Sequence, residues 1–227
     1  MLRLFPFIIC ALFACSGSNL DEPIEQLESK TKLKYLALGD SYTIGQGVSE
    51  LERWPNILTA KLNESDTIIS ETKIIAKTGW TTNNLLSAIE NEAPTDYDLV
   101  SLLIGVNNQY RGQDFGVYEQ EFDSLLNIAI EIAGNSEMVF VVSIPDYGVT
   151  PFGQSNAEKI AEELDDYNEY AKKVCETQNI PFVDITEISR QMGNNYGALA
   201  PDNLHPSGNQ YRNWVEKIYP VVLNLID

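Results

Sequence analysis

The chain has 227 residues and a hydrophobic fraction of 44%, enough for one ordinary globular core and too little for a bundle of membrane helices. Its 33 acidic and 15 basic side chains give a formal net charge of −18, and no basic cluster offsets this excess, which argues against binding to nucleic acid or anionic bilayers. With one histidine and three cysteines, the chain lacks the residues for a histidine-rich metal site, a zinc ribbon or a disulfide framework. We expect no metal and no other cofactor.

The N-terminus has the pattern of a secretory signal. A basic tip at Arg3 precedes a short apolar run that cannot span a bilayer. The run ends at 12–15, Leu-Phe-Ala-Cys, which resembles the lipobox of bacterial lipoproteins. The resemblance implies a lipoprotein signal peptide over 1–14 and a lipid on Cys15, which would hold the protein at the bacterial cell envelope, on the periplasmic or outer-membrane face. Cleavage near Ala14 without acylation would instead release a soluble secreted protein.

The rest of the chain divides into a tether and a folded part. Residues 15–32 are polar and have no steady apolar period, so we predict a solvated tether there. From 33 to 227, short apolar runs alternate with longer amphipathic ones, without a linker rich in glycine, proline or serine. This alternation is typical of a parallel sheet that helices cover on both faces. We therefore predict one α/β domain over 33–227, a three-layer α/β/α sandwich.

The individual elements follow in chain order. The predicted strands are 33–38, 73–76, 98–104, 138–144 and 181–185. The predicted helices are 54–63, 82–91, 118–133, 156–177 and 208–226. Cys175 falls on an apolar helical stripe, so we expect a buried, inert thiol. Ser207 and Gln210 form a Ser-x-x-Gln capping box at the start of the last helix, which puts His205 just outside a helix N-terminus.

The first candidate for chemistry is Gly39-Asp40-Ser41, directly after the first predicted strand. Its glycine permits a tight turn, and its serine hydroxyl would lie at the carboxyl end of the strand, where open α/β sheets bind their ligands. Alone, the tripeptide is a weak signal, because average residue frequencies produce it in roughly one chain of this length in twenty. An Asp-Ser turn that caps a helix is the alternative.

The second candidate is Asp202-Asn203-Leu204-His205-Pro206, in the loop before the last helix. A serine hydroxyl needs a base with a pKa near 7, and that base needs a carboxylate to hold its tautomer. His205 is the only histidine, and Asp202, three positions earlier, can fold back to reach its ring. A surface histidine beside a helix cap explains this segment equally well when it is considered alone.

The positions of the candidate residues connect the two segments. Ser41, Gly79 and Asn107 follow the first three predicted strands, and His205 lies in the segment after the fifth. In a parallel sheet all four loops emerge at one edge. An active site at that edge explains the arrangement better than four independent turns do.

The order Gly-Asp-Ser, glycine, Gly-x-Asn and Asp-x-x-His-Pro resembles the SGNH hydrolases, also called the GDSL family of esterases and lipases, over essentially the whole predicted domain. The resemblance implies a flavodoxin-like parallel sheet of about five strands and a serine esterase that works through an acyl-enzyme. Ser41 would be the nucleophile, His205 the general base and acid, and Asp202 its orienting carboxylate. The implied oxyanion hole consists of the backbone N–H groups of Ser41 and Gly79 and the side-chain amide of Asn107.

Two positions depart from the common family pattern. Asn108 stands where the family commonly has aspartate, which puts the geometry of that loop in question and leaves the donor of Asn107 in place. Tyr42 follows the serine in place of leucine, a change that leaves the nucleophile unaltered.

Residues beyond the strand ends should shape a small pocket: Tyr42, Trp80, Tyr110, Arg111 and the segment 146–152. The aromatic side chains could pack on an acyl chain, stack on a sugar or cover the sheet edge. Arg111 could meet an anionic leaving group or be an ordinary solvated side chain.

The expected function is hydrolysis of short acyl or acetyl esters, with a small ester or an acylated glycan as substrate. No nucleic-acid partner is expected, and membrane contact would come only through the lipid on Cys15. Two alternatives remain open at this point. One is a polysaccharide O-deacetylase, and the other is a surface lipoprotein that binds glycan or protein on the same fold without catalysis.

Overall fold

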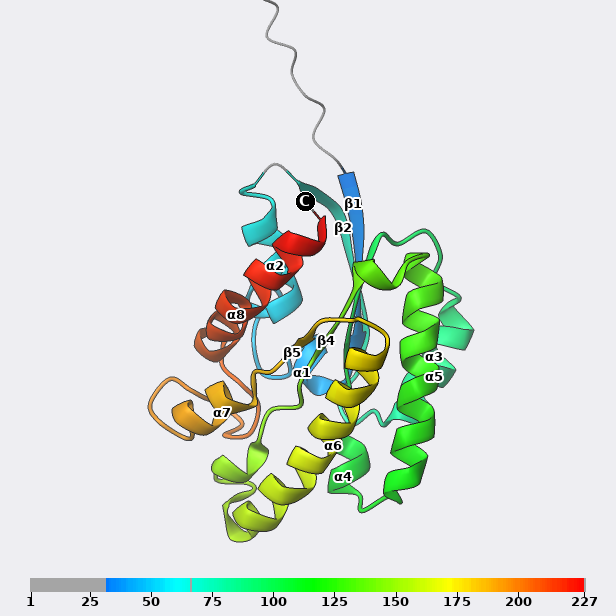
Figure 1. The fold of residues 1–227 in the computed structure, drawn as a ribbon. Helices are drawn as coiled ribbons and strands as arrows, with labels where there is room; N and C mark the ends of the chain where they lie inside the picture. Colours follow the sequence, from blue (N-terminus) through cyan, green and yellow to red (C-terminus); the bar gives the residue numbers. More distant parts are fainter. Residues whose placement is uncertain (1–31, 66, 227) are drawn as a thin grey trace, which may run out of the picture.

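The computed structural model describes residues 32–65 and 67–226, so the predicted signal peptide, the lipidation site Cys15 and nearly all of the predicted tether 15–32 lie outside the described residues. The described chain forms five parallel strands in the spatial order β2-β1-β3-β4-β5, the flavodoxin-like order (Figure 1). The strands are β1 (Lys32–Gly39), β2 (Ile68–Ala76), β3 (Leu99–Leu103), β4 (Val139–Val142) and β5 (Phe182–Val183). This confirms the predicted fold class.

Helices cover both faces of the sheet (Figure 1). The α-helices are α1 (Ser41–Ile44), α2 (Trp54–Leu62), α3 (Thr82–Glu92), α4 (Val106–Tyr110), α5 (Phe115–Ala133), α6 (Ala157–Thr177), α7 (Thr186–Met192) and α8 (Gly208–Ile226). Short 3-10 turns are η1 (Glu50–Glu52), η2 (Ser136–Met138), η3 (Tyr147–Val149) and η4 (Gln154–Asn156). Helices α2 and α8 pack together on one side, whereas α3 and α5 lie on the other, where aromatic side chains join α5 to α6.

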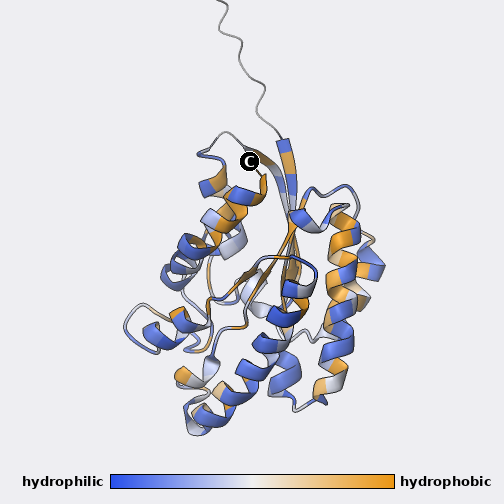
Figure 2. Cartoon of the chain, viewed as in Figure 1, coloured by the Kyte–Doolittle hydropathy of each residue, from blue (hydrophilic) through white to orange (hydrophobic). Residues whose placement is uncertain are grey.

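Burial explains why the apolar runs become strands. Every residue of β3 and β4 is buried, as expected for central strands that helices cover on both faces. In Figure 2 the strands are hydrophobic, and the surrounding helices carry hydrophilic residues on their outer faces. No helix within residues 32–65 and 67–226 is long and apolar enough to cross a membrane.

Several boundaries differ from the prediction. Strand β2 begins at Ile68 instead of 73, because its first residues pair with the start of β1 although polar residues interrupt its apolar pattern. Strand β5 has only 2 residues. Helices α1, α4 and α7, of 4, 5 and 7 residues, are too short to produce a helical period in the sequence and were not predicted.

Cys175 lies on the buried face of α6 and is completely inaccessible. Burial raises the pKa of its thiol to about 12, so the thiolate is scarcely populated at neutral pH. This confirms the prediction of an inert thiol.

Candidate active site

The turn from β1 into α1 positions Ser41. A side chain at Gly39 would come within 2.5 Å of the carbonyl oxygen of Leu103 on the neighbouring strand, so the close approach of β1 and β3 requires glycine here. Asp40 then caps α1, because its carboxylate accepts a hydrogen bond of 3.0 Å from the backbone N–H of Tyr42. Ser41 is the first residue of the helix, and its own N–H has no acceptor among the described residues. That N–H is therefore available to a bound oxygen.

Asp40 is completely buried, and one of its carboxylate oxygens has no hydrogen-bond partner among the described residues. Burial raises the pKa of this carboxyl to about 7, and hydrogen bonds with the backbone offset only part of that effect. The residue before the predicted nucleophile thus changes its charge near neutral pH.

A short hairpin carries Asp202 and His205. The N–H of Ala200 donates to the carbonyl of His205 at 2.8 Å, and the N–H of Ser207 donates to the carbonyl of Ala198 at 3.0 Å. Asn203, with a φ of 58°, lies in the turn between Ala200 and His205. The hairpin fixes both candidate residues relative to the start of α8.

The predicted cap of α8 is half confirmed. The Ser207 hydroxyl accepts the N–H of Gln210 at 3.2 Å. The side chain of Gln210 does not return to Ser207, however, but donates to the carbonyl of Ala198 at 3.2 Å. The hairpin explains this difference, because the carbonyl of Ala198 already accepts the Ser207 N–H that a capping box would satisfy.

Asp202 and His205 form a hydrogen-bonded pair. Asp202 Oδ2 lies 2.7 Å from His205 Nδ1, and Asp202 Oδ1 accepts the backbone N–H groups of Leu204 and His205 at 3.0 and 2.9 Å. Partial burial acts to raise the pKa of Asp202, but these hydrogen bonds outweigh it and lower the pKa below its usual value. An ionised carboxylate only accepts hydrogen bonds, so Nδ1 carries the imidazole proton and Nε2 is left as an acceptor in the neutral ring.

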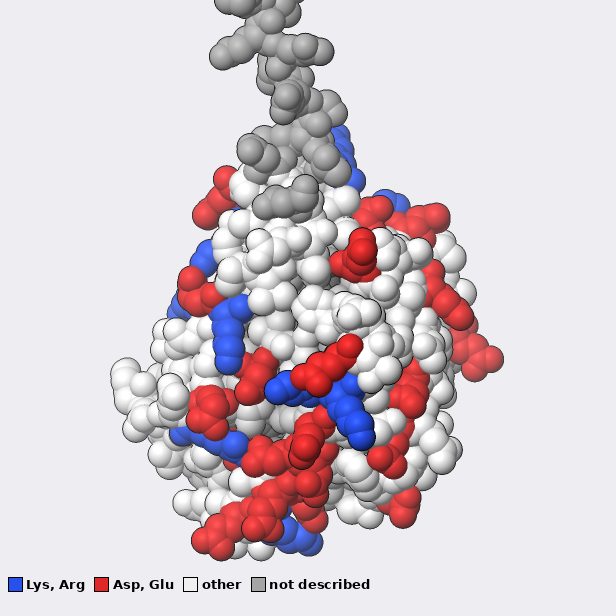
Figure 3. All heavy atoms as spheres, viewed as in Figure 1, with Lys and Arg blue, Asp and Glu red and all other residues white. Residues whose placement is uncertain are grey.

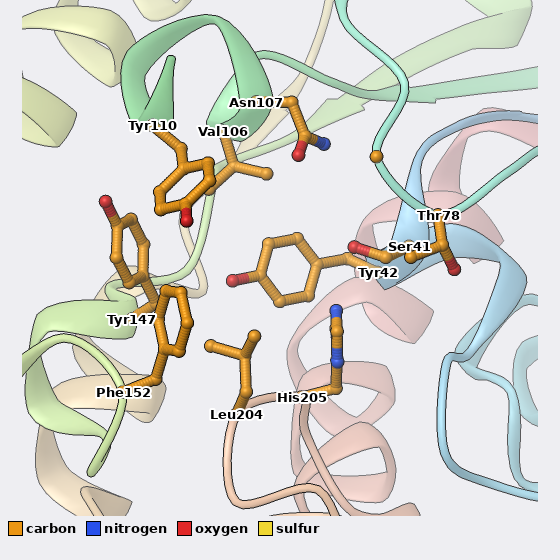
Figure 4. Close-up of a pocket in the computed structure, with 11 residues that line it drawn as sticks. Ser41, Tyr42, Thr78, Val106, Asn107, Tyr110, Tyr147, Phe152, Leu204 and His205 are labelled. Atoms are coloured by element: carbon orange, nitrogen blue, oxygen red, sulfur yellow. The ribbon is translucent and has the colours of Figure 1, made fainter. Parts of the chain in front are cut away.

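Ser41 and His205, 164 positions apart in the sequence, line the same cavity. In Figure 4 the ring nitrogen of His205 that is not held by Asp202 points toward the Ser41 hydroxyl. Both residues are buried, and the edge of the Tyr42 ring packs against the imidazole at a centroid distance of 5.7 Å. Ser41 and His205 therefore lie at one end of the cavity, and Asp202 holds the imidazole from outside the cavity wall.

Gly79 and Asn107 lie on the same cavity. Gly79 has a φ of 83°, in the region that favours glycine, and its N–H has no acceptor within the described part of the chain. Asn107 Nδ2 donates one proton to the carbonyl of Trp80 at 3.0 Å, which leaves the second proton of the amide for a ligand. The Arg111 guanidinium donates to the carbonyl of Gly79 at 2.6 Å and so holds this loop from outside the cavity.

Asn108, the departure from the family pattern, organises its loop through Thr82. Its side chain is fully buried, its Oδ1 accepts the Thr82 N–H at 3.1 Å, and its Nδ2 donates to Thr82 Oγ1 at 2.6 Å. The Thr82 hydroxyl in turn donates to the carboxylate of Glu121 on α5. The negative charge near this loop is thus supplied by Glu121, while Asn108 keeps the bonding pattern complete. Neither Thr82 nor Glu121 was predicted as part of the site.

The cavity has a volume of about 150 Å³, and among the described residues its wall contains no aspartate, glutamate, lysine or arginine. Its lining residues are Ser41, Tyr42, Thr78, Gly79, Val106, Asn107, Tyr110, Tyr147, Phe152, Leu204 and His205. Figure 4 shows Ser41, His205 and Asn107 on one side and Tyr110, Tyr147 and Phe152 on the other, with the Tyr42 ring between the two groups.

This wall corrects part of the sequence prediction. Tyr42 and Tyr110 line the cavity as expected, but Trp80 and Arg111 do not. Trp80 packs against the hydrophobic core, and the side chain of Arg111 is occupied by the carbonyl of Gly79. Val106 and Leu204, which the prediction missed, directly precede Asn107 and His205, so adjacency to the motif residues was the available signal.

Solved structures share this architecture. The crystal structure of TesA matches with a TM-score of 0.65 and 18% identity, over 85% of this chain and 99% of that chain. The lipase Lip_vut3 from a goat rumen metagenome gives a TM-score of 0.68 and 20% identity over 83% of this chain and 97% of its own. The acetyl xylan esterase AlAXEase matches with a TM-score of 0.64 and 17% identity, over 84% of this chain and 100% of its own. Identities at this level establish a common fold alone.

No protein with a curated description matches the sequence. The family model described as "GDSL-like Lipase/Acylhydrolase family" matches residues 37–212, which include all five candidate site residues in the described chain. Because this match spans most of the sequence, the chain belongs to the GDSL-like lipase/acylhydrolase family.

Proposed function

We propose that the protein is a serine esterase that hydrolyses carboxylic esters with short acyl groups through an acyl-enzyme. The observation that carries the proposal is the hydrogen bond of 2.7 Å between Asp202 and Nδ1 of His205. The other nitrogen of the His205 imidazole points toward the Ser41 hydroxyl (Figure 4). Membership of a hydrolase family supports it.

In the first half of the reaction, Ser41 Oγ attacks the ester carbonyl carbon while His205 Nε2 takes the hydroxyl proton. The carboxylate of Asp202 stabilises the imidazolium that forms. Negative charge develops on the carbonyl oxygen, which the N–H groups of Ser41 and Gly79 and the amide of Asn107 stabilise by hydrogen bonds. His205 then gives its proton to the alkoxide oxygen, the carbon–oxygen bond breaks, and the alcohol leaves.

In the second half, a water molecule replaces the alcohol. His205 takes a proton from the water as its oxygen attacks the acyl carbon, and the same donors stabilise the second tetrahedral intermediate. The bond to Ser41 Oγ then breaks, Oγ receives the proton from His205, and the carboxylic acid is released. Each group returns to its starting protonation state.

The charge distribution favours an uncharged substrate. No aspartate, glutamate, lysine or arginine lines the cavity in the part of the chain that the structure describes. In Figure 3 acidic side chains gather over α6, the helix that carries Glu158, Glu162, Glu163, Asp165, Asp166 and Glu169. Together with the net charge of −18, this surface opposes attachment to anionic lipid by charge.

The alternatives predict different activities. Polysaccharide O-deacetylation is possible on this fold, since the acetyl xylan esterase AlAXEase shares it, but a cavity of about 150 Å³ with an aromatic end is larger than an acetyl group requires. A binding protein without catalysis would need no activated serine.

The test compares the wild type with Ser41→Ala on p-nitrophenyl butyrate. We expect the wild type to hydrolyse this ester and Ser41→Ala to lose the activity while its melting temperature stays unchanged. Equal turnover by both proteins would refute the proposal.

We also propose that Cys15 carries a lipid and holds the protein at the bacterial envelope. The support is the Leu-Phe-Ala-Cys sequence at 12–15. Expression of the full chain in a bacterium should place the wild type in the membrane fraction and Cys15→Ser in the soluble fraction. The same distribution for both proteins would refute the anchor.

A further inference from the structure

We infer that Tyr110, Tyr147 and Phe152 bind the acyl group of the ester and limit it to about six carbon atoms. The inference rests on the proposed esterase activity, which it extends by assigning one side of the ester to one end of the cavity. It concerns the class of substrate, namely esters of short, uncharged, apolar carboxylic acids.

The direction of the acyl group follows from the four substituents of the tetrahedral carbon. One substituent is Ser41 Oγ. A second, the oxyanion, must face Asn107 and Gly79, and a third, the alcohol oxygen, must lie near His205, which protonates it. In Figure 4 Asn107 and His205 lie on opposite sides of the Ser41 hydroxyl. The remaining direction leads past the Tyr42 ring to the aromatic end of the cavity, so the acyl group belongs there.

The size limit follows from the volume. The cavity measures about 150 Å³, and its wall is mainly apolar beyond the reacting groups. An engineered protein cavity of about 150 Å³ with an apolar lining accommodates benzene. By this comparison, the space suits about six carbon atoms, the size of a butanoyl to hexanoyl group.

Three rings in mutual contact close the aromatic end. The ring centroids of Tyr110 and Phe152 are 5.7 Å apart, and each lies 6.2 Å from the centroid of Tyr147. The rings come from two segments at the same sheet edge, since Tyr110 ends α4 after β3 and the other two follow β4. Contacts at these distances are typical of stabilising aromatic pairs.

Tyr147 is the fixed part of this wall. It is 6% exposed, and its hydroxyl donates to Gln109 Oε1 at 2.9 Å. The Gln109 side chain is itself held, because it donates to the carboxylate of Glu163 at 2.7 Å. Tyr110 and Phe152, by contrast, are 56% and 51% exposed, so they cover the cavity from the solvent side and can be truncated without opening the core.

Esters of one alcohol with acids of increasing length test the assignment. For the wild type, kcat/KM on p-nitrophenyl acetate, butyrate and hexanoate should rise about three- to fourfold per added methylene, up to the length that fills the cavity. It should then fall by 10-fold or more for the decanoate, since roughly 10- to 200-fold discrimination per misfitting group is usual in apolar pockets. Phe152→Ala and Tyr110→Ala should raise the ratio of decanoate to butyrate activity about 10-fold.

Tyr196→Ala is the matched control, because Tyr196 is a fully exposed aromatic residue that does not line the cavity. It should leave the chain-length profile unchanged. A parallel series of acetate esters with ethyl, butyl and hexyl alcohols should show a much weaker dependence on length.

Two outcomes separate the inference from the proposed function. A wild type that hydrolyses the esters, with a decanoate-to-butyrate ratio that neither truncation alters, would overturn the inference alone. A strong length dependence only in the alcohol series would also overturn it, because the aromatic end would then bind the leaving group. A wild type inactive on every ester would overturn the proposed function as well.

Discussion

The carboxylate of Asp202 reaches the imidazole of His205 across 2.7 Å, and it does so within a hairpin that also ties both residues to the start of α8. Because Asp202 accepts two backbone N–H groups as well, its orientation does not depend on the histidine alone. The pair is therefore arranged before any substrate binds, which is the condition for effective base catalysis.

Replacing Asp202 by asparagine should lower kcat about 10³- to 10⁴-fold. The asparagine amide can donate to Nδ1, which would favour the ring tautomer with the proton on Nε2, where it cannot accept from Ser41. Steady-state kinetics on p-nitrophenyl butyrate measures the loss, and the melting temperature should change little. A decrease in kcat of less than about 10-fold would show that Asp202 has no orienting role.

Replacing Asn107 by alanine should lower kcat about 10²- to 10³-fold with a small change in KM, because in the proposed mechanism its amide contributes one oxyanion donor. The hydrogen bond to the carbonyl of Trp80 is lost as well. A matched control is Arg111→Ala, which removes another bond to this loop but no donor in the cavity. If the control lowers kcat as much as Asn107→Ala does, loop position rather than the Asn107 donor explains the loss.

Asp40 should make the protein less stable as the pH rises toward neutrality. Its pKa of about 7 in the folded chain lies above the usual 3.8, so the folded state binds this proton more tightly than the unfolded state does. The stabilising contribution is complete below pH of about 4 and is lost as the pH rises through about 7.

The test compares the wild type with Asp40→Asn, which stays uncharged at every pH and can still accept the Tyr42 N–H. The difference in melting temperature, variant minus wild type, should grow by a few degrees between pH 5 and pH 8.5. A free-energy change of about 1 kcal/mol corresponds to roughly 2–4 °C in a chain of this size. A difference that does not vary with pH would contradict the shifted pKa.

Replacing Asn108 by aspartate, the residue expected from the resemblance, should destabilise this protein. The side chain could no longer donate to Thr82 Oγ1, and two carboxylates would compete for the single hydroxyl proton that Glu121 now accepts. We expect a loss of about 1–3 kcal/mol for Asn108→Asp, measured by urea unfolding.

The double variant Asn108→Asp/Glu121→Gln tests whether the two positions are coupled. It should recover at least half of that loss, because glutamine accepts or donates without charge. Additive effects of the two changes would mean that Glu121 does not compensate for Asn108.

The sequence predicted the residues of the site more completely than the contacts between them. Ser41, Asp202 and His205 could be found because each lies in a short motif next to a strand end, and parallel strands bring those ends to one edge. The hydrogen bonds that join Asn108 to Thr82 and Thr82 to Glu121 could not be predicted, because they depend on how α3 packs on α5.

The same reasoning explains the errors at the cavity wall. Aromatic character identified Tyr110 and Tyr147 as wall residues but placed Trp80 there too, since composition does not say whether a ring faces a cavity or the core. Arg111 was expected to meet a substrate or the solvent, and its hydrogen bond to Gly79 depends on a backbone carbonyl that no sequence pattern reveals.

The most direct test of the account is whether Ser41 is an activated nucleophile. Incubation with a fluorophosphonate, followed by mass spectrometry of the peptides, should give one adduct per chain, on Ser41. Ser41→Ala should remain unlabelled, and His205→Ala should react far more slowly, because its serine lacks a base. Labelling of wild type and Ser41→Ala to the same extent, or no labelling of a folded wild type, would contradict the account.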